Sequence, residues 1–480
     1  MPTYDFERIG RFRDRDDERA AMQAWYGRDD DPRALMLHGR RRVGKSWLFR
    51  AFAHRRETDI FVASTRALGD QLGGFASLLE RDGERPSLPD VETFFRVLYR
   101  RARDERRLAV IDELPNLIAV DRDLPSTLLK VMEEEAGQSR LKLILTGSHV
   151  AVMEELLAER QPLHDRVEGL RVRPLDFWKA KTILGPGPGD RLLTAYALAG
   201  GMPKYLAELE GAEDPGDRLA GLALSPLGRL FDEARSVLAQ ELRQPATYFS
   251  LLAALSYGPA DFEAVERRSR VERHRITKYL GTLQELGLVS SRVPVTDRER
   301  KTRGRLYVLS DGFLRFWFRY VFPFQADLES GLDPALVVKN EVMPTLADHL
   351  APSIEGIARE WARRSGAGDA TRVGSWWGKA VDEYRRTGER TTEEIDIVGL
   401  RGKHATLIGE VRWRTKPMSV AILGEIDRFK VPALRQAGVE VDRPVILLVS
   451  RSGFTDGVRE AAARESRIML VDPDGLSAGE

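Results

Sequence analysis

The first residues with a clear chemical meaning form a glycine-rich loop with a lysine and a serine at its end. Glycine allows backbone N–H groups to surround phosphate oxygens, the lysine ammonium neutralises the outer phosphates, and the serine hydroxyl is a ligand for Mg²⁺. An apolar run over residues 34–37 precedes the loop, and residues 47–52 can continue it as a helix. We therefore predict a site for a nucleoside triphosphate and Mg²⁺ in a strand–loop–helix unit. The spacing is G-x-x-x-x-G-K-S, and the residues are Gly39, Arg40, Arg41, Arg42, Val43, Gly44, Lys45 and Ser46.

Two adjacent acids, Asp112 and Glu113, follow the apolar run over residues 108–111. In a phosphate-binding enzyme, Asp112 would hold Mg²⁺ and Glu113 would polarise the attacking water. The alternative is a pair of solvated acids at a strand end. The position of the pair, in an apolar run downstream of the loop, favours ATP hydrolysis.

A further strand is predicted over residues 141–147, between the strands that carry the loop and the acids. Ser148, at its end, is the candidate for contact with the γ-phosphate and the attacking water, and Thr146 is the second choice. A simple helix cap by Ser148 is the alternative. Runs over residues 59–64 and 169–175 would complete a five-stranded parallel α/β sheet with helices between the strands.

Several segments together resemble the archaeal-type ATPases of the STAND branch of the AAA+-related P-loop NTPases. The upstream residues 12–18 are similar to the F-x-x-R-x-x-E entry motif of that family. Residues 201–203 are similar to its G-x-P signature, which implies coupling between nucleotide and a helical region. The segments that carry the resemblance read GRRRVGKS, LAVIDELP, LILTGSHVAVM, PLHDR and LAGGMPKYL.

The same resemblance implies that Arg166 senses the γ-phosphate. Relatives usually have Tyr-Gly before this arginine, whereas this chain has His164 and Asp165. An ordinary surface arginine is the alternative.

Residues 246–311 show the pattern of a winged helix-turn-helix. Helical spacing over residues 248–255, 262–268 and 273–286 precedes two alternating runs, at residues 288–291 and 305–309, that predict a hairpin. Residues 261–310 include twelve Lys or Arg and seven Asp or Glu, which is a local excess of positive charge. A basic helix and wing suit contact with double-stranded DNA, and a regulatory lever with solvated charges is the alternative. The basic residues are Arg273, His274, Arg275 and Lys278 on the third helix and Arg298, Arg300, Lys301, Arg303 and Arg305 in the wing.

An aromatic stripe over residues 312–322 follows this unit. Its helical spacing favours a core or a seam between domains over base stacking.

The C-terminal part carries two predicted strands, residues 394–400 and 405–413. They would bring Asp396 and Glu410 to one edge, where both can ligate Mg²⁺ or Mn²⁺. Arg412, two positions on, faces the same side. The pattern resembles the PD-(D/E)XK nuclease core. In this resemblance, Glu355 matches the acidic position on the first helix of that core.

Arg412 stands where that nuclease motif has lysine. Arginine stays protonated near a metal-bound water, although it can still orient a phosphate. Two interpretations therefore remain open: a metal-dependent nuclease, and a degraded nuclease fold that serves recognition or assembly.

Length and composition limit the broader interpretation. A chain of 480 residues is too long for one core, and we expect an ATPase core at 1–180, a helical lid at 181–240, a winged helix at 241–325 and a nuclease-like domain at 326–480. Lys and Arg (75) balance Asp and Glu (74), so the overall charge indicates no partner. The absence of cysteine excludes disulfides and thiol nucleophiles and suits the cytoplasm. No apolar stretch is long enough for a membrane span.

These features predict an ATP-driven switch that couples nucleotide state to DNA binding or processing. One alternative is a nucleotide-regulated scaffold with an inactive nuclease fold. Another is an ATP-gated, metal-dependent DNA nuclease. The family resemblance also implies assembly into a homo-oligomer.

Overall fold

The computed structural model describes residues 13–29, 31, 33–242, 245–297, 304–388 and 390–479. The chain divides into two compact units, Met1–Pro174 with Met202–Lys204, and Leu175–Gly201 with Tyr205–Glu480. None of the described helices is long and apolar enough to cross a membrane. Five residues of the motifs above fall outside the described ranges: Phe12, Arg298, Arg300, Lys301 and Arg303.

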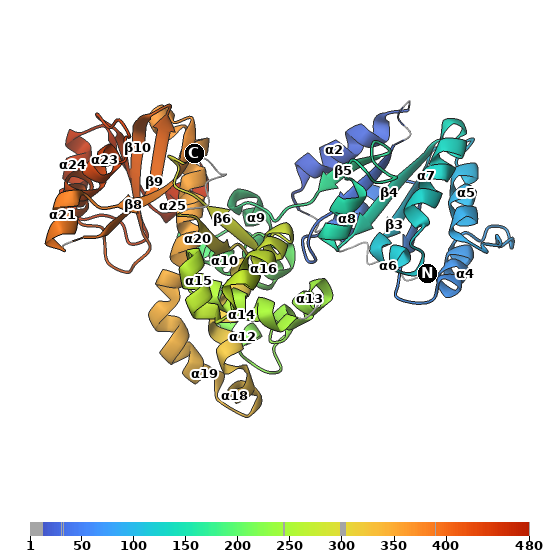
Figure 1. The fold of residues 1–480 in the computed structure, drawn as a ribbon, viewed down its shortest axis with the longest axis horizontal. Coiled ribbons are helices and arrows are strands. Elements are labelled where there is room, and N and C mark those ends of the chain that lie inside the picture. Colours follow the sequence, from blue (N-terminus) through green and yellow to red (C-terminus); the bar gives the residue numbers. More distant parts are fainter. Residues whose placement is uncertain are drawn as a thin grey trace. The chain divides into compact units, whose positions relative to one another are not determined.

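The first unit contains one parallel sheet of five strands in the order β2-β3-β4-β1-β5 (Figure 1). Strands β1 and β4 consist entirely of buried residues, as expected where helices cover both faces of a parallel sheet. β4 pairs with both β1 and β3, so the predicted place of this strand between the other two is confirmed. The strands are β1 (Ala34–His38), β2 (Thr58–Val62), β3 (Arg107–Asp112), β4 (Leu141–Gly147) and β5 (Val167–Arg171).

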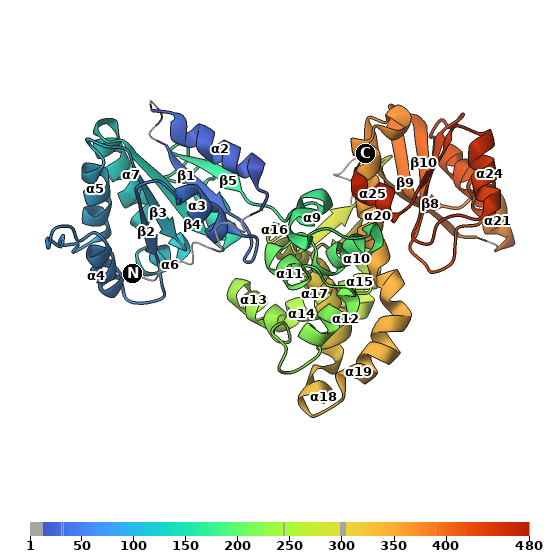
Figure 2. The same cartoon turned by 180° about the vertical axis from the view of Figure 1, so that it is seen from behind.

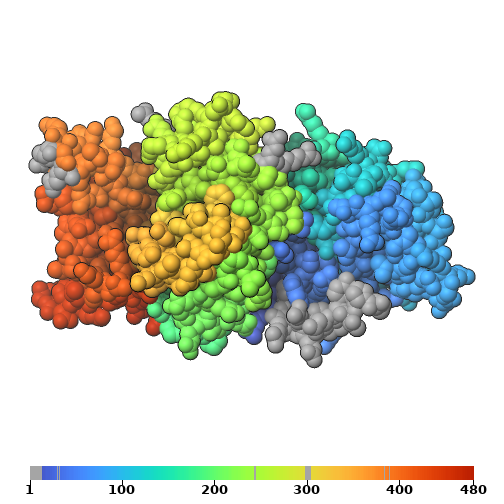
Figure 3. All heavy atoms as spheres, turned by 90° about the horizontal axis from the view of Figure 1, so that it is seen from below, coloured from blue at the N-terminus to red at the C-terminus, as the bar shows by residue number. Residues whose placement is uncertain are grey.

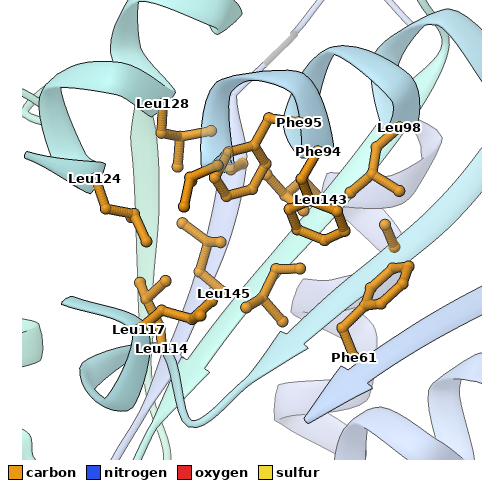
Figure 4. Packing of buried hydrophobic residues seen from close by; sticks show 14 of the residues in the cluster. Phe61, Phe94, Phe95, Leu98, Leu114, Leu117, Leu124, Leu128, Leu143 and Leu145 are labelled. Atoms are coloured by element: carbon orange, nitrogen blue, oxygen red, sulfur yellow. The ribbon is translucent and has the colours of Figure 1, made fainter. Parts of the chain in front are cut away.

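A core of aromatic and leucine side chains packs one face of this sheet against helices (Figure 4). Helix α5 begins after Asp90, whose carboxylate caps the backbone N–H of Thr93, and it buries an apolar stripe that includes Phe94. The rings of Phe94 and Phe61 meet edge-on with centroids 5.0 Å apart. This packing supports the strands from one side, and their carboxyl ends lie along one end of the parallel sheet. The helices of the unit are α2 (Asp16–Gly27), α3 (Lys45–Ala53), α4 (Leu68–Leu78), α5 (Val91–Arg101), α6 (Leu114–Val120), α7 (Leu124–Glu135) and α8 (Val150–Leu156).

The second unit begins with helices and then shows the predicted series of three helices and a hairpin. In the hairpin, β6 (Val289–Arg292) pairs antiparallel with β7 (Leu306–Leu309). The loop before the second of the three helices supplies a cap, since Asp261 accepts a hydrogen bond from the N–H of Ala264. The helices are α9 (Phe177–Leu184), α10 (Gly189–Ala199), α11 (Pro203–Glu208), α12 (Pro215–Ala223), α13 (Glu233–Glu241), α14 (Pro245–Leu255), α15 (Phe262–Ser269) and α16 (Arg273–Glu285).

The aromatic stripe forms α17 (Gly312–Phe316) and a π-helical turn, η2 (Trp317–Val321). Phe313 and Trp317 are fully buried, which confirms the stripe as core. Gly312 permits this packing, because a Cβ at this position would lie 2.7 Å from the carbonyl oxygen of Ala197.

The long helix α20 (Met343–Arg364) leads into a second five-stranded sheet of order β12-β11-β10-β9-β8. Strands β8 to β10 are antiparallel, whereas β10, β11 and β12 are parallel. The strands are β8 (Arg372–Lys379), β9 (Thr392–Arg401), β10 (His404–Arg412), β11 (Val445–Ser450) and β12 (Ile468–Val471). The remaining helices are α18 (Gln325–Glu329), α19 (Pro334–Val337), α21 (Asp382–Thr387), α22 (Ala421–Glu425), α23 (Val431–Gln436), α24 (Asp456–Arg464) and α25 (Pro473–Ala478), with a π-helical turn η6 (Ile426–Lys430) after α22.

The last helix of the second unit returns to its first helices (Figure 2). The N–H of Gly189, at the start of α10, donates a 2.7 Å hydrogen bond to Asp474 of α25. Lys181 of α9 donates to the carbonyl oxygen of Ser477 at 2.7 Å. The middle helices and the C-terminal residues therefore pack as one body, and their surfaces adjoin in Figure 3.

Candidate functional site

The predicted phosphate loop lies at the carboxyl end of β1 and opens helix α3 through Gly44. Gly44 has a φ of 96°, a left-handed conformation that glycine adopts without strain. A Cβ on Gly39 would lie 2.4 Å from the carbonyl oxygen of Val172. Lys45 donates from Nζ to the carbonyl oxygens of Gly39 and Arg40, at 2.6 and 3.1 Å. The loop thus has the geometry of a phosphate cradle with its lysine folded inward.

Ser46 and Asp112, the two residues predicted to hold Mg²⁺, lie side by side. The Ser46 hydroxyl lies 3.5 Å from Asp112 Oδ2, so the two oxygens are close enough to bind one ion. Asp112 is buried, and its pKa is raised because burial and the neighbouring Glu113 disfavour its charge, against the pull of Arg50 and Lys45. A divalent ion would relieve this cost, so the two residues fit the predicted Mg²⁺.

Glu113 and Ser148 meet across the ends of β3 and β4. The Ser148 hydroxyl lies 2.7 Å from Glu113 Oε1, and the Ser148 N–H donates to Glu113 Oε2 at 3.2 Å. Ser148 Oγ is also 3.2 Å from Lys45 Nζ, and Arg41 lies 3.8 Å from Glu113 Oε1. Glu113 has a φ of 57°, a conformation that costs energy outside glycine and occurs often at functional sites. The structure thus brings Glu113, Ser148 and Lys45 together, while no described atom forms a hydrogen bond with the buried Thr146 hydroxyl.

The entry segment supports the loop from behind. Arg15 is buried, forms an ion pair of 2.6 Å with Glu18, and donates to the carbonyl oxygen of Val43 at 2.8 Å. Arg15 and Glu18 are the arginine and glutamate of the F-x-x-R-x-x-E pattern, so that pattern was the signal for a supporting residue that was not predicted individually. Pro203 lies on the other side, 3.6 Å from where a Cβ on Gly44 would stand.

Arg166 lies away from this group of residues. It precedes β5, which pairs in parallel with β1, and its carbonyl oxygen accepts from the N–H of Ala34 at the start of β1. The length of β1, roughly 13 Å at the usual rise per residue, separates that end of the sheet from the phosphate loop. The Arg166 guanidinium pairs with Glu133 at 3.2 Å on the surface. The structure therefore does not bring Arg166 to the nucleotide site of its own chain.

The exposed face of α16 carries the basic residues predicted for the third helix of the winged helix-turn-helix pattern. Arg273, His274, Arg275 and Lys278 are all exposed. Arg273 pairs with Glu266 at 2.7 Å, and His274 lies 3.6 Å from Glu272. Arg275 and Lys278 therefore contribute most to the positive charge of this face.

The C-terminal sheet brings Asp396 and Glu410 to one edge, as predicted. Arg412 bridges them, because its guanidinium lies 3.7 Å from Asp396 Oδ2 and 3.0 Å from Glu410 Oε2. Asp396 Oδ2 also accepts from the N–H of Val411 at 2.8 Å. Burial and Asp396 raise the pKa of Glu410 to about 7, against the pull of Lys430 and Arg412.

Glu355 joins this edge from α20. Burial and the charge of Asp396 raise its pKa to about 7, while Arg359, 3.6 Å away, opposes the shift. Arg359 also donates to the backbone carbonyl of Asp396 at 2.9 Å. Among the described residues, no group of three or more His, Cys, Asp or Glu side chains is arranged to hold a metal ion.

Lys430 is a member of this cluster that was not predicted from the sequence. It lies at the end of η6, is buried, and places Nζ 2.6 Å from Glu410 Oε1. No local pattern marked it, because Lys430 follows Asp427 and Arg428 in a helical stretch of mixed charge.

Comparisons with protein families place two segments of the chain. Residues 12–209 match a family described as an ATPase domain predominantly from Archaea. This segment contains the phosphate loop, Asp112, Glu113 and Ser148. Residues 317–422 match a second family, described as archaeal and bacterial proteins of unknown function.

Individual relatives are distant. An uncharacterised protein of Methanocaldococcus jannaschii is 26% identical over 391 residues, which are 79% of this chain and 82% of that protein. A Walker-type ATPase of Pyrococcus abyssi, known as a solved structure, is 18% identical with a TM-score of 0.48, over 64% of this chain and 96% of the other. The ORC2 protein of Aeropyrum pernix is 15% identical with a TM-score of 0.43, over 66% and 95% of the two chains.

Proposed function

Starting from an archaeal-type P-loop ATPase domain at residues 12–209, we propose that the chain is an ATP-driven switch whose output is DNA binding. ATP bound at the phosphate loop holds one arrangement of the chain, and hydrolysis releases it. The contact of Ser148 with both Glu113 and Lys45 carries the proposal, because it joins the residue for water activation to the residue for the γ-phosphate.

The roles of the residues follow from their contacts. Lys45 turns from the loop carbonyls to the β- and γ-phosphates, since a phosphate is a stronger partner than a carbonyl oxygen. Ser148 holds the Glu113 carboxylate, which orients the attacking water and accepts its proton. Ser46 and Asp112 would hold Mg²⁺, which neutralises charge that develops on the phosphates.

Residues 201–203 form the proposed coupling element. Met202–Lys204 group with the first unit, whereas Gly201 and Tyr205 group with the second. Pro203 stands beside Gly44 of the phosphate loop. A shift of the phosphate loop on nucleotide binding would therefore move Pro203, which is the first residue of α11.

The proposed output is the winged helix formed by α14–α16 and the hairpin. In this proposal α16 enters the major groove, with Arg275 and Lys278 near the phosphate backbone. The test measures ATP turnover and DNA retention by gel electrophoresis on the same sample, with ATP, with ADP and without nucleotide. The proposal expects ATP hydrolysis and a nucleotide-dependent change in DNA affinity. Absence of hydrolysis, or equal DNA affinity in all three states, contradicts it.

A further inference from the structure

Glu410 has a positively charged partner at each of its two carboxylate oxygens. Arg412 Nη2 lies 3.0 Å from Oε2, and Lys430 Nζ lies 2.6 Å from Oε1. The carboxylate is almost fully buried, with 1% of its surface exposed. Each oxygen therefore has a cation within ion-pair distance, although the contact of Oε1 with Lys430 does not have hydrogen-bond geometry.

The two cations come from different elements. Arg412 is the last residue of β10, the strand that also carries Glu410, and its guanidinium reaches across to Asp396 of β9 at 3.7 Å. Lys430 comes from the π-helical turn η6 and also donates to the backbone carbonyl of Glu394 at 2.6 Å. The protein therefore holds both charges in place through separate anchors.

We infer that Arg412 and Lys430 occupy the position that a divalent cation would take between Asp396 and Glu410, so that this site is neutralised from within the chain. A hard divalent ion needs several oxygen ligands at 2.0–2.6 Å. It would have to displace Arg412 from both carboxylates and would stand beside the buried ammonium of Lys430. Removing the partner of a buried charge is strongly unfavourable, so the internal ion pairs compete well with Mg²⁺ or Mn²⁺.

The arrangement gives the C-terminal domain a role without metal chemistry. The carboxylate–arginine–lysine cluster ties β9, β10 and η6 together and leaves Arg412 about one-third exposed at the end of the central strand β10. The end of this strand then presents a guanidinium rather than a metal-bound water. The inference goes beyond the proposed ATP switch and does not depend on it.

The test is a Mn²⁺ titration of the full-length protein without nucleotide, followed by electron paramagnetic resonance. We expect the number of bound Mn²⁺ ions per chain below 1 mM Mn²⁺ to be the same in wild type and Glu410→Gln, and plasmid DNA to stay intact with 1 mM Mn²⁺. Removal of the two internal cations, in Arg412→Ala/Lys430→Met, is expected to add one bound Mn²⁺ that Asp396→Asn then abolishes. Arg412→Ala alone, which leaves the buried lysine in place, provides a milder version in case the double variant is unstable.

Three results overturn the inference. The first is Mn²⁺ binding by wild type that is lost in Glu410→Gln. The second is plasmid cleavage that is lost in Asp396→Ala. The third is a failure of both Arg412→Ala and the double variant to gain a site. ATP turnover, measured on the same samples, reports on the proposed switch separately from the Mn²⁺ result.

Discussion

The hydroxyl of Ser148 lies 2.7 Å from Glu113 Oε1 and 3.2 Å from Lys45 Nζ, and it joins the acid at the end of β3 to the phosphate loop after β1. Glu113 and Lys45 are separated by 68 positions in the sequence, yet one side chain connects them. This connection makes the placement of the Glu113 carboxylate dependent on what Lys45 contacts. The first predictions concern these three residues.

Replacement of Glu113 by glutamine removes the proton acceptor but keeps the size of the side chain. We expect kcat for ATP hydrolysis to fall by about 100-fold or more, as is typical of a lost general base. ATP binding, measured by calorimetry, should persist, because Lys45 and the loop N–H groups are unchanged. A variant that hydrolyses ATP at the wild-type rate contradicts the role of Glu113.

Ser148→Ala removes the hydroxyl that positions Glu113. A hydrogen bond to a charged group contributes about 1.5–3 kcal/mol, so kcat should fall by about 10-fold to 100-fold. Thr146→Val is the matched control, because no described atom forms a hydrogen bond with the buried Thr146 hydroxyl. A larger loss in Thr146→Val than in Ser148→Ala would reverse the choice between the two residues.

The basic face of α16 is tested through the salt dependence of DNA binding. Arg275→Ala/Lys278→Ala removes two exposed cations, and the slope of log affinity against log salt should decrease by about 2. Arg401→Ala/Arg464→Ala removes two exposed charges from the C-terminal sheet and α24 and should leave the slope unchanged. Wild-type affinity that does not vary with salt would contradict DNA binding by this face.

His38, at the end of β1, predicts a pH dependence of stability. Burial, together with Arg171 and Lys45, lowers its pKa from 6.5 to about 4, so the unfolded chain binds a proton that the folded chain rejects. The contribution of this site to the free energy of unfolding is therefore at its maximum above pH 6.5, and it decreases as the pH falls towards 4. Urea unfolding of wild type and His38→Gln at pH 7.5, 6.0 and 5.0 should show wild type losing stability relative to the variant. A difference that stays constant across these pH values contradicts the shift.

Gly312→Ala tests the close packing of α17 against α10. The added methyl group would meet the carbonyl oxygen of Ala197 at 2.7 Å, and overpacking of this kind costs about 1–3 kcal/mol. The midpoint of thermal unfolding should fall. Gly281→Ala, where no atom lies within 4 Å of the new Cβ, is the control and should be neutral or stabilising. Equal midpoints for the two variants would contradict the packing argument.

The nucleotide site was largely predictable because its chemistry is local to each strand end. Apolar runs defined β1, β3 and β4, and parallel pairing then had to bring Lys45, Asp112 and Ser148 to one edge. Arg166 was placed by resemblance alone. Its position at the start of β5, at the opposite edge, follows from a strand register that no local pattern reveals.

The C-terminal cluster was predictable only in part. Alternation along two neighbouring strands brought Asp396 and Glu410 together. Lys430 comes from a π-helical turn between α22 and α23, and the extra residue of such a turn shifts the side chain out of ordinary helical spacing. The periodicity of the sequence therefore gave no indication that this lysine reaches Glu410.

The contact between α25 and α10 affects how the chain can be made. Gly189 and Asp474 are hydrogen-bonded although 285 positions separate them. During synthesis, α9 and α10 emerge long before the helix that they pack against, and they remain without that partner until the ribosome has added residue 478. The first unit, in which the described contacts connect residues up to 174 and the segment 202–204, can reach its fold much earlier. A nascent chain would therefore acquire the nucleotide-binding loop well before it acquires a finished second unit.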